Sequence, residues 1–108
     1  MDDFNCPVRI TTEIIGGKWK PLILFYLQDG TRRFGQLQKL LPGTSKKMLT
    51  QRLRELERDD IIHRRVFAQV PPRVEYSLTR HGQGLRPILV LMSEWGKRHR
   101  VRHGAAKN

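Results

Sequence analysis

The stretch "SKKMLTQRLRELERDD", residues 45–60, decides the fold of this chain. Leu49, Leu53 and Leu56 recur at the spacing that places side chains on one side of an α-helix. The sequence therefore predicts a helix over residues 45–59 that packs its leucines on a core.

The opposite side of this helix is basic. At about 100° per residue, four side chains fall together across from the leucines: Lys47, Gln51, Arg54 and Arg58. Arg54 and Arg58 are like charges at i and i+4, which lowers helix stability in isolation. A solvated amphipathic helix is the ordinary alternative, but this charge pattern favours an external anion.

The whole chain is basic. Its 108 residues carry 21 Lys and Arg against 10 Asp and Glu, a net charge of +11, with 38% apolar residues. The tail, residues 97–108, holds five of the basic residues and no acid, so the body is basic as well. This balance indicates a polyanionic partner, of which nucleic acid is the commonest, against the alternative of an inert basic surface.

Length and apolar patterning predict one domain over residues 1–108, with a core of about 6–99 and a basic tail at 100–108. The acidic N-terminus lacks the order of a signal peptide, and the longest apolar run, residues 22–27, is too short to cross a bilayer. We therefore expect a cytoplasmic protein without a membrane partner.

The remaining sequence predicts short elements around the central helix. Helices are expected at 6–15, 18–28, 32–41 and about 80–100, and strands at 61–69 and 73–79 joined through the prolines at 71–72. Two helices joined by a tight turn and followed by a hairpin form a winged helix-turn-helix. The fold class is therefore mainly α with a β-hairpin wing.

In this layout the second helix of the pair enters the major groove of double-stranded DNA. Gln51 suits an adenine edge and Arg54 a guanine edge, whereas lysines and helix N-termini suit phosphates. The predicted DNA-binding residues of the helix are Ser45, Lys46, Lys47, Thr50, Gln51, Arg54 and Arg58. Thr44 and Ser45 are the candidate N-caps.

The wing, near residues 69–73, adds Arg73 to the predicted DNA-binding residues. An arginine there can enter an A·T-rich minor groove, although a charge that protects an edge strand is the alternative. Arg32 and Arg33, where the third helix is expected to begin, are further candidates for contact with backbone phosphate.

The last helix and helix 6–15 carry more apolar residues than one small core can cover. A homodimer through these two helices explains the excess and would place two recognition helices on successive major-groove faces. A larger monomer core is the alternative.

Cys6 is the single cysteine, so no intrachain disulfide can form. Before Pro7 it falls near a helix N-terminus, which favours the reactive thiolate, and Arg9 would act in the same direction. Cys6 is either a redox or effector sensor or a small residue at a helix start. His99 and His103 stand at metal-ligand spacing without a third ligand, so we expect no metal and no cofactor.

These residues also carry a resemblance. The segments "CPV", "GGKWKPLIL", "RRFGQL", "LPGTSKKMLTQRLRELERD" and "VPPRVEYSLT" resemble the HxlR-type transcriptional regulators, relatives of the MarR group, over roughly residues 6–99. The resemblance implies a dimeric winged-helix DNA-binding protein that joins its N-terminal and last helices across the dimer. It also implies that the cysteine matching Cys6 senses quinones, aldehydes or oxidants in some members.

Two positions depart from the pattern of that family. Asp60 stands where glycine is usual, and we expect it to accept a left-handed cap at small cost. Phe67 replaces a frequent tyrosine. The tail beyond residue 99 either adds salt-dependent affinity or adds nothing.

The alternative function is a basic winged-helix module that binds RNA or a protein partner. RNA modules that stack bases expose aromatic side chains, whereas the aromatics here fall on predicted core or interface faces. No phosphate loop, carboxylate pair or activated nucleophile is present in the sequence, so we expect no enzyme activity.

Overall fold

The computed structural model describes residues 6–104. In chain order its elements are α1 (Pro7–Ile15), α2 (Lys20–Leu27), β1 (Arg32–Arg33), α3 (Phe34–Leu40), α4 (Lys46–Arg58), β2 (Ile62–Phe67), β3 (Arg73–Leu78), the 3₁₀ turn η2 (Gly82–Leu85) and α5 (Arg86–Arg102). This is the predicted winged helix-turn-helix. Residues 105–108 of the predicted basic tail lie outside the described residues.

Two glycines separate α1 from α2, as predicted. A Cβ on Gly16 would lie 2.2 Å from the backbone oxygen of Thr12, and Gly17 has a φ of +89°. Larger side chains at these positions would be strained, so the sequence ends α1 there. Pro21 is tolerated in the first turn of α2, where a backbone N–H has no helical partner.

Helices α3 and α4 form the helix-turn-helix, with a turn around Gly43 (φ +97°) between them. Helix α4 ends at Arg58, and Asp60 then adopts a left-handed φ of +61°. The N–H of Ile61 donates to the oxygen of Leu56 at 2.9 Å. The expectation that Asp60 would accept this conformation is confirmed.

The sheet has three antiparallel strands in the order β1-β3-β2. Residues 32 and 33 were predicted to open the third helix, and this is wrong: Arg32 lies opposite Tyr76 and Arg33 opposite Glu75 in β1. A strand of two residues is too short to show alternation, so only the tertiary pairing reveals it.

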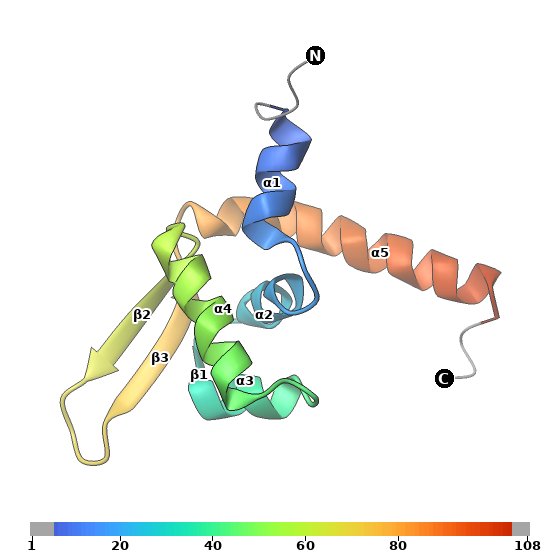
Figure 1. Ribbon diagram of the computed structural model, residues 1–108. Coiled ribbons are helices and arrows are strands. Elements are labelled where there is room, and N and C mark those ends of the chain that lie inside the picture. The colour runs from blue at the N-terminus through green and yellow to red at the C-terminus, as the bar shows by residue number, and fades with distance from the viewer. Residues whose placement is uncertain (1–5, 105–108) are drawn as a thin grey trace.

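The core lies between α2, α4 and the sheet, with α2 at its centre (Figure 1). The leucine stripe of α4 is buried as predicted, since Leu49, Leu53 and Leu56 are at most 1% exposed. On the sheet side Tyr76 is 8% exposed. Burial of the leucine stripe fixes which side of α4 remains at the surface.

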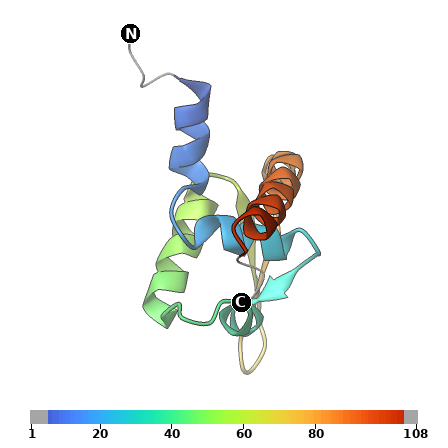
Figure 2. The same ribbon diagram turned by 90° about the vertical axis from the view of Figure 1, so that its right-hand side faces the viewer.

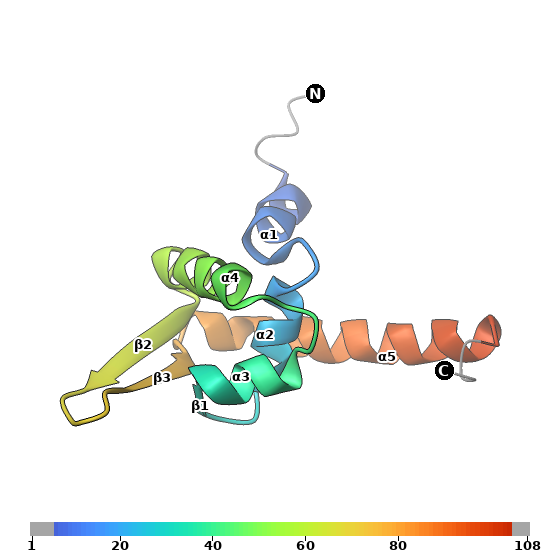
Figure 3. The same cartoon turned by 60° about the horizontal axis from the view of Figure 1, so that its bottom comes forward.

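The predicted start of the last helix near residue 80 is wrong. The Thr79 hydroxyl accepts from the N–H of Gly82, the first residue of η2, at 2.8 Å, and α5 begins only at Arg86. A Cβ on Gly82 would lie 2.1 Å from the oxygen of Ile61, so a glycine is required at this contact. From there α5 runs away from the body on the side opposite the wing (Figures 1 and 3).

Helix α1 stands apart from the sheet. In Figure 2, α5 is seen nearly end-on and passes beside the C-terminal end of α1. No helix within residues 6–104 is both long enough and apolar enough to cross a membrane.

Candidate nucleic-acid interface

Helix α4 begins with a side-chain cap. Ser45 has an extended backbone (φ −79°, ψ 158°), and its hydroxyl accepts from the N–H of Met48 at 3.0 Å. Of the two candidate N-caps, the structure uses Ser45 and not Thr44. The cap fixes the first turn of α4, from which two lysines project.

The outer side of α4 brings five of the predicted DNA-binding residues together around one hollow. We call these residues the basic face: Lys46, Lys47, Thr50, Gln51 and Arg54. Within residues 6–104, neither the two lysines nor Arg54 has a carboxylate within ion-pair distance. The Thr50 hydroxyl donates to the backbone oxygen of Lys46 at 2.8 Å. The basic face therefore presents cations and one amide to solvent.

The acidic residues of α4 lie on its flanks. Glu55 Oε1 is 2.6 Å from the guanidinium of Arg52 and 3.2 Å from Lys20 Nζ. Burial raises the pKa of Glu55, but hydrogen bonds and charge from Arg52 and Lys20 outweigh it and hold the pKa below its ordinary value. Glu55 is thus ionised and neutralises cations beside the basic face, not on it.

The other acids of this region act similarly. Glu57 lies 3.4 Å from Arg64 of β2, and Asp59 lies 3.7 Å from Arg58. Arg58 is exposed and does not line the hollow of the basic face.

The wing holds its arginines more tightly. Arg73 lies opposite Phe67 in the sheet, with its guanidinium 4.0 Å from the centre of the Phe67 ring and 3.3 Å from Glu75. Arg65 lies 4.6 Å from the same ring. Arg73 is therefore in the last strand pair before the loop of residues 68–72, which forms the tip of the wing. Sequence reasoning missed Phe67 as the platform for these two cations.

Arg32 and Arg33 precede α3, and the side chain of Arg32 is held by contacts within the protein. Arg32 donates to the backbone oxygen of Tyr26 at 3.0 Å and lies 3.8 Å from Asp29. Arg33 remains exposed, and its backbone N–H donates to the Gln36 side chain at 2.8 Å. Only Arg33 of this pair has a side chain that projects into solvent.

Charges from α4 and the wing meet at Tyr76. Burial raises the pKa of its phenol; Arg64 opposes this, Glu57 adds to it and Arg54 opposes it.

Cys6 is the N-cap of α1, as predicted, and its thiol is exposed without a side-chain capping bond. One turn into α1, Arg9 Nε lies 3.4 Å from the carboxylate of Glu13.

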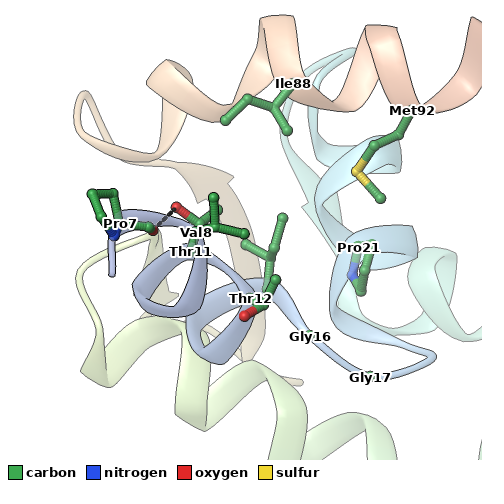
Figure 4. A pocket seen from close by; sticks show the side chains of 10 residues that line it. Pro7, Val8, Thr11, Thr12, Gly16, Gly17, Pro21, Ile88 and Met92 are labelled. Atoms are coloured by element: carbon green, nitrogen blue, oxygen red, sulfur yellow. Dashed lines mark hydrogen bonds between the residues drawn. The ribbon is translucent and has the colours of Figure 1, made fainter. Parts of the chain in front are cut away.

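An apolar groove lies between α1, α2 and α5. Figure 4 shows Val8 of α1 and Ile88 and Met92 of α5 around one opening, with Pro21 at its side. Several apolar side chains along these helices are exposed: Val8, Ile10, Leu22, Phe25, Ile88, Val90, Leu91, Met92, Trp95 and Val101.

The far part of α5 carries the histidines. The His99 ring stacks on Trp95 at 5.0 Å between centroids and lies 4.2 Å from the His103 ring. In the part of the chain that the structure describes, no three His, Cys, Asp or Glu side chains are grouped to hold a metal ion.

Known proteins resemble the chain over most of its length. The sequence model of the HxlR-like helix-turn-helix family matches residues 14–104. YdeP of Bacillus subtilis (strain 168), an uncharacterized HTH-type transcriptional regulator, is 53% identical over 102 residues, which are 94% of this chain and 80% of YdeP.

Solved structures agree with this similarity. The redox regulator HypR in its reduced form matches with a TM-score of 0.87 and 46% identity, over 92% of this chain and 98% of HypR. Its oxidised form matches with a TM-score of 0.83 and 49% identity, over 86% of this chain and 96% of HypR.

Proposed function

Because this chain belongs to the HxlR-like helix-turn-helix family of transcriptional regulators, we propose that it is a homodimer that binds a palindromic operator in double-stranded DNA. Its α4 enters the major groove and its wing lies against the neighbouring minor groove. The observation that carries this proposal is the basic face: cations without ion-pair partners, on a capped helix whose other side is locked into the core.

Within the basic face the roles follow from side-chain chemistry. Gln51 and Arg54 contact base edges, because an amide and a guanidinium form bidentate pairs with adenine and guanine. Lys46 and Lys47 hold phosphates, as does Ser45 at the N-terminus of α4. Thr50 lies beside them and would have to release its bond to the Lys46 oxygen to donate to a phosphate. Arg58, Arg33 and Arg73 contribute backbone or minor-groove contacts, whereas Arg32 acts through the fold.

The exposed apolar side chains of α1 and α5 support the homodimer. Leu91 is 63% exposed and Trp95 is 60% exposed on one side of α5. A contiguous apolar surface of this kind is typical of an interface. Leu91→Glu should convert the dimer to a monomer, as measured by sedimentation equilibrium, and an unchanged mass would remove α5 from the interface.

We select DNA from a random duplex pool with the reduced protein at about 0.15 M salt, where screening trims nonspecific contacts. The expected product is an inverted repeat with half-sites about one helical turn apart. Absence of any enriched sequence would reject specific recognition and direct the search to an RNA or protein partner.

The exposed thiol of Cys6 supports a redox response, as does the similarity to HypR, which is a redox regulator. Cys6→Ser should leave binding by the reduced protein intact and remove the effect of an oxidant such as diamide on operator affinity. A response that persists in Cys6→Ser would assign Cys6 a structural role.

A further inference from the structure

A second polar hollow lies on the flank of α4, away from the basic face. It has a volume of about 300 Å³ and lies between the loop that joins α1 to α2 and the first half of α4. Its lining residues are Gly16, Gly17, Lys18, Trp19, Lys20, Met48 and Arg52. No role in the proposed contact with bases requires this hollow.

The hollow has more positive than negative charge. Lys20 is 8% exposed, and its Nζ shares one carboxylate oxygen, Glu55 Oε1, with the guanidinium of Arg52. Lys18 has no ion pair within residues 6–104; its ammonium lies 4.7 Å from the ring of Trp19. Three cations therefore line the hollow, and one carboxylate, that of Glu55, pairs with two of them. A buried lysine is costly unless its charge is fully compensated.

The cations are held in place by the fold. Arg52 is fixed by its bond to Glu55 at 2.6 Å and by a contact from its Nε to the sulfur of Met48 at 3.3 Å. Lys18 is exposed, and its ammonium contacts the Trp19 ring, which also lines the hollow. A site held in advance loses little conformational freedom when an anion enters.

We propose that this hollow binds a small oxyanion, a phosphate or carboxylate group, between Lys18, Lys20 and Arg52. Charge-assisted hydrogen bonds from an ammonium and a guanidinium are the ordinary means of holding such a group. The oxyanion is either a free solute or a backbone phosphate of bound DNA, because Arg52 is the neighbour of Gln51 on α4. The lining of the site comes from the loop that follows α1, from the start of α2 and from α4.

The first arm of the test uses the full chain without DNA and does not rest on the proposed function. Inorganic phosphate is titrated against ¹⁵N-labelled protein at constant ionic strength. The amides of Gly17, Lys18 and Arg52 should shift and saturate, and Lys18→Gln should weaken the apparent affinity about tenfold, the loss of one charge-assisted hydrogen bond. Lys39→Gln on α3 is the matched control, since this exposed lysine lies outside the hollow.

The second arm identifies the source of the anion. The slope of log affinity against log salt is measured for a random-sequence duplex, so sequence-specific recognition is not required. A DNA phosphate in the hollow predicts a slope smaller by about 0.9 in Lys18→Gln. A free anion predicts an unchanged slope together with the saturable shift of the first arm.

Absence of both effects, with no saturable shift and no change in slope, would overturn the proposal. Lys18 is exposed, so Lys18→Gln should fold as the wild type does. Failure of the operator selection with a positive phosphate titration would reject the proposed function and leave the oxyanion site standing.

Discussion

Helix α4 and the wing are both rich in cations, but their surroundings differ. On the basic face, Lys47 and Arg54 project into solvent, and no carboxylate of residues 6–104 lies within ion-pair distance of them. In the wing, Arg73 is stacked on Phe67 and lies 3.3 Å from Glu75. A cation without a partner gains more from a phosphate or a base edge than one that must first exchange a protein partner.

The number of cations in a region therefore does not predict how strongly that region would contribute to DNA binding. The acidic residues of α4 lie on its flanks, where Glu55 pairs with Lys20 of α2 and Glu57 with Arg64 of β2. Neither carboxylate therefore neutralises a cation of the basic face. We therefore expect α4 to dominate recognition and the wing to contribute less, and four measurements, from the largest expected effect to the smallest, test this ranking.

Arg54→Ala should have the largest effect. Loss of a bidentate base contact should reduce discrimination between the selected operator and a scrambled duplex by about 1–3 kcal/mol, or roughly 5- to 150-fold. Competition fluorescence anisotropy measures it. Arg98→Ala on α5 is the matched control, because it removes the same charge away from the basic face; equal losses in both variants would show that Arg54 contributes charge alone.

Lys47→Ala should weaken specific and random duplexes alike. A phosphate contact carries no sequence information, so the salt slope should fall by about 0.9 while discrimination is unchanged. Affinity measured at several salt concentrations provides the slope. A loss confined to the operator would move Lys47 from the phosphates to a base edge.

Phe67→Leu tests the wing. Removal of the ring takes away the platform of Arg73 and Arg65 and should lower the free energy of unfolding by about 0.5–1 kcal/mol. Operator affinity should change less than in Arg54→Ala. Phe67→Tyr keeps the ring and should match the wild type in urea unfolding; a wing variant that costs more affinity than Arg54→Ala would reverse the ranking.

A pH series tests the flank of α4. The folded-state pKa of Glu55 lies below its ordinary value of 4.5, so the stability from its ion pairs is present above pH 4.5 and is lost as pH falls through the lower, folded-state pKa. Urea midpoints measured down through this window should decline more steeply in the wild type than in Glu55→Gln. Parallel curves would show that Glu55 does not stabilise the fold.

Much of the fold could be predicted from local pattern. The leucine stripe of α4, the glycine break after α1, the hairpin and the left-handed Asp60 follow from spacing and backbone preference. Strand β1 and the late start of α5 could not be predicted, because both depend on contacts with distant residues. Arg32 pairs with Tyr76, and Gly82 lies against Ile61.

The sequence by itself determined that α4 has one apolar and one basic side, because helical periodicity alone separates them. It also determined the family to which the chain belongs. Only the tertiary structure decided which cations remain without partners. Lys20 and Glu55 are far apart in the chain, and their 3.2 Å contact exists only because α2 packs beside α4. Which charges form ion pairs depends on distances in the folded protein, and these cannot be read from separation in the sequence.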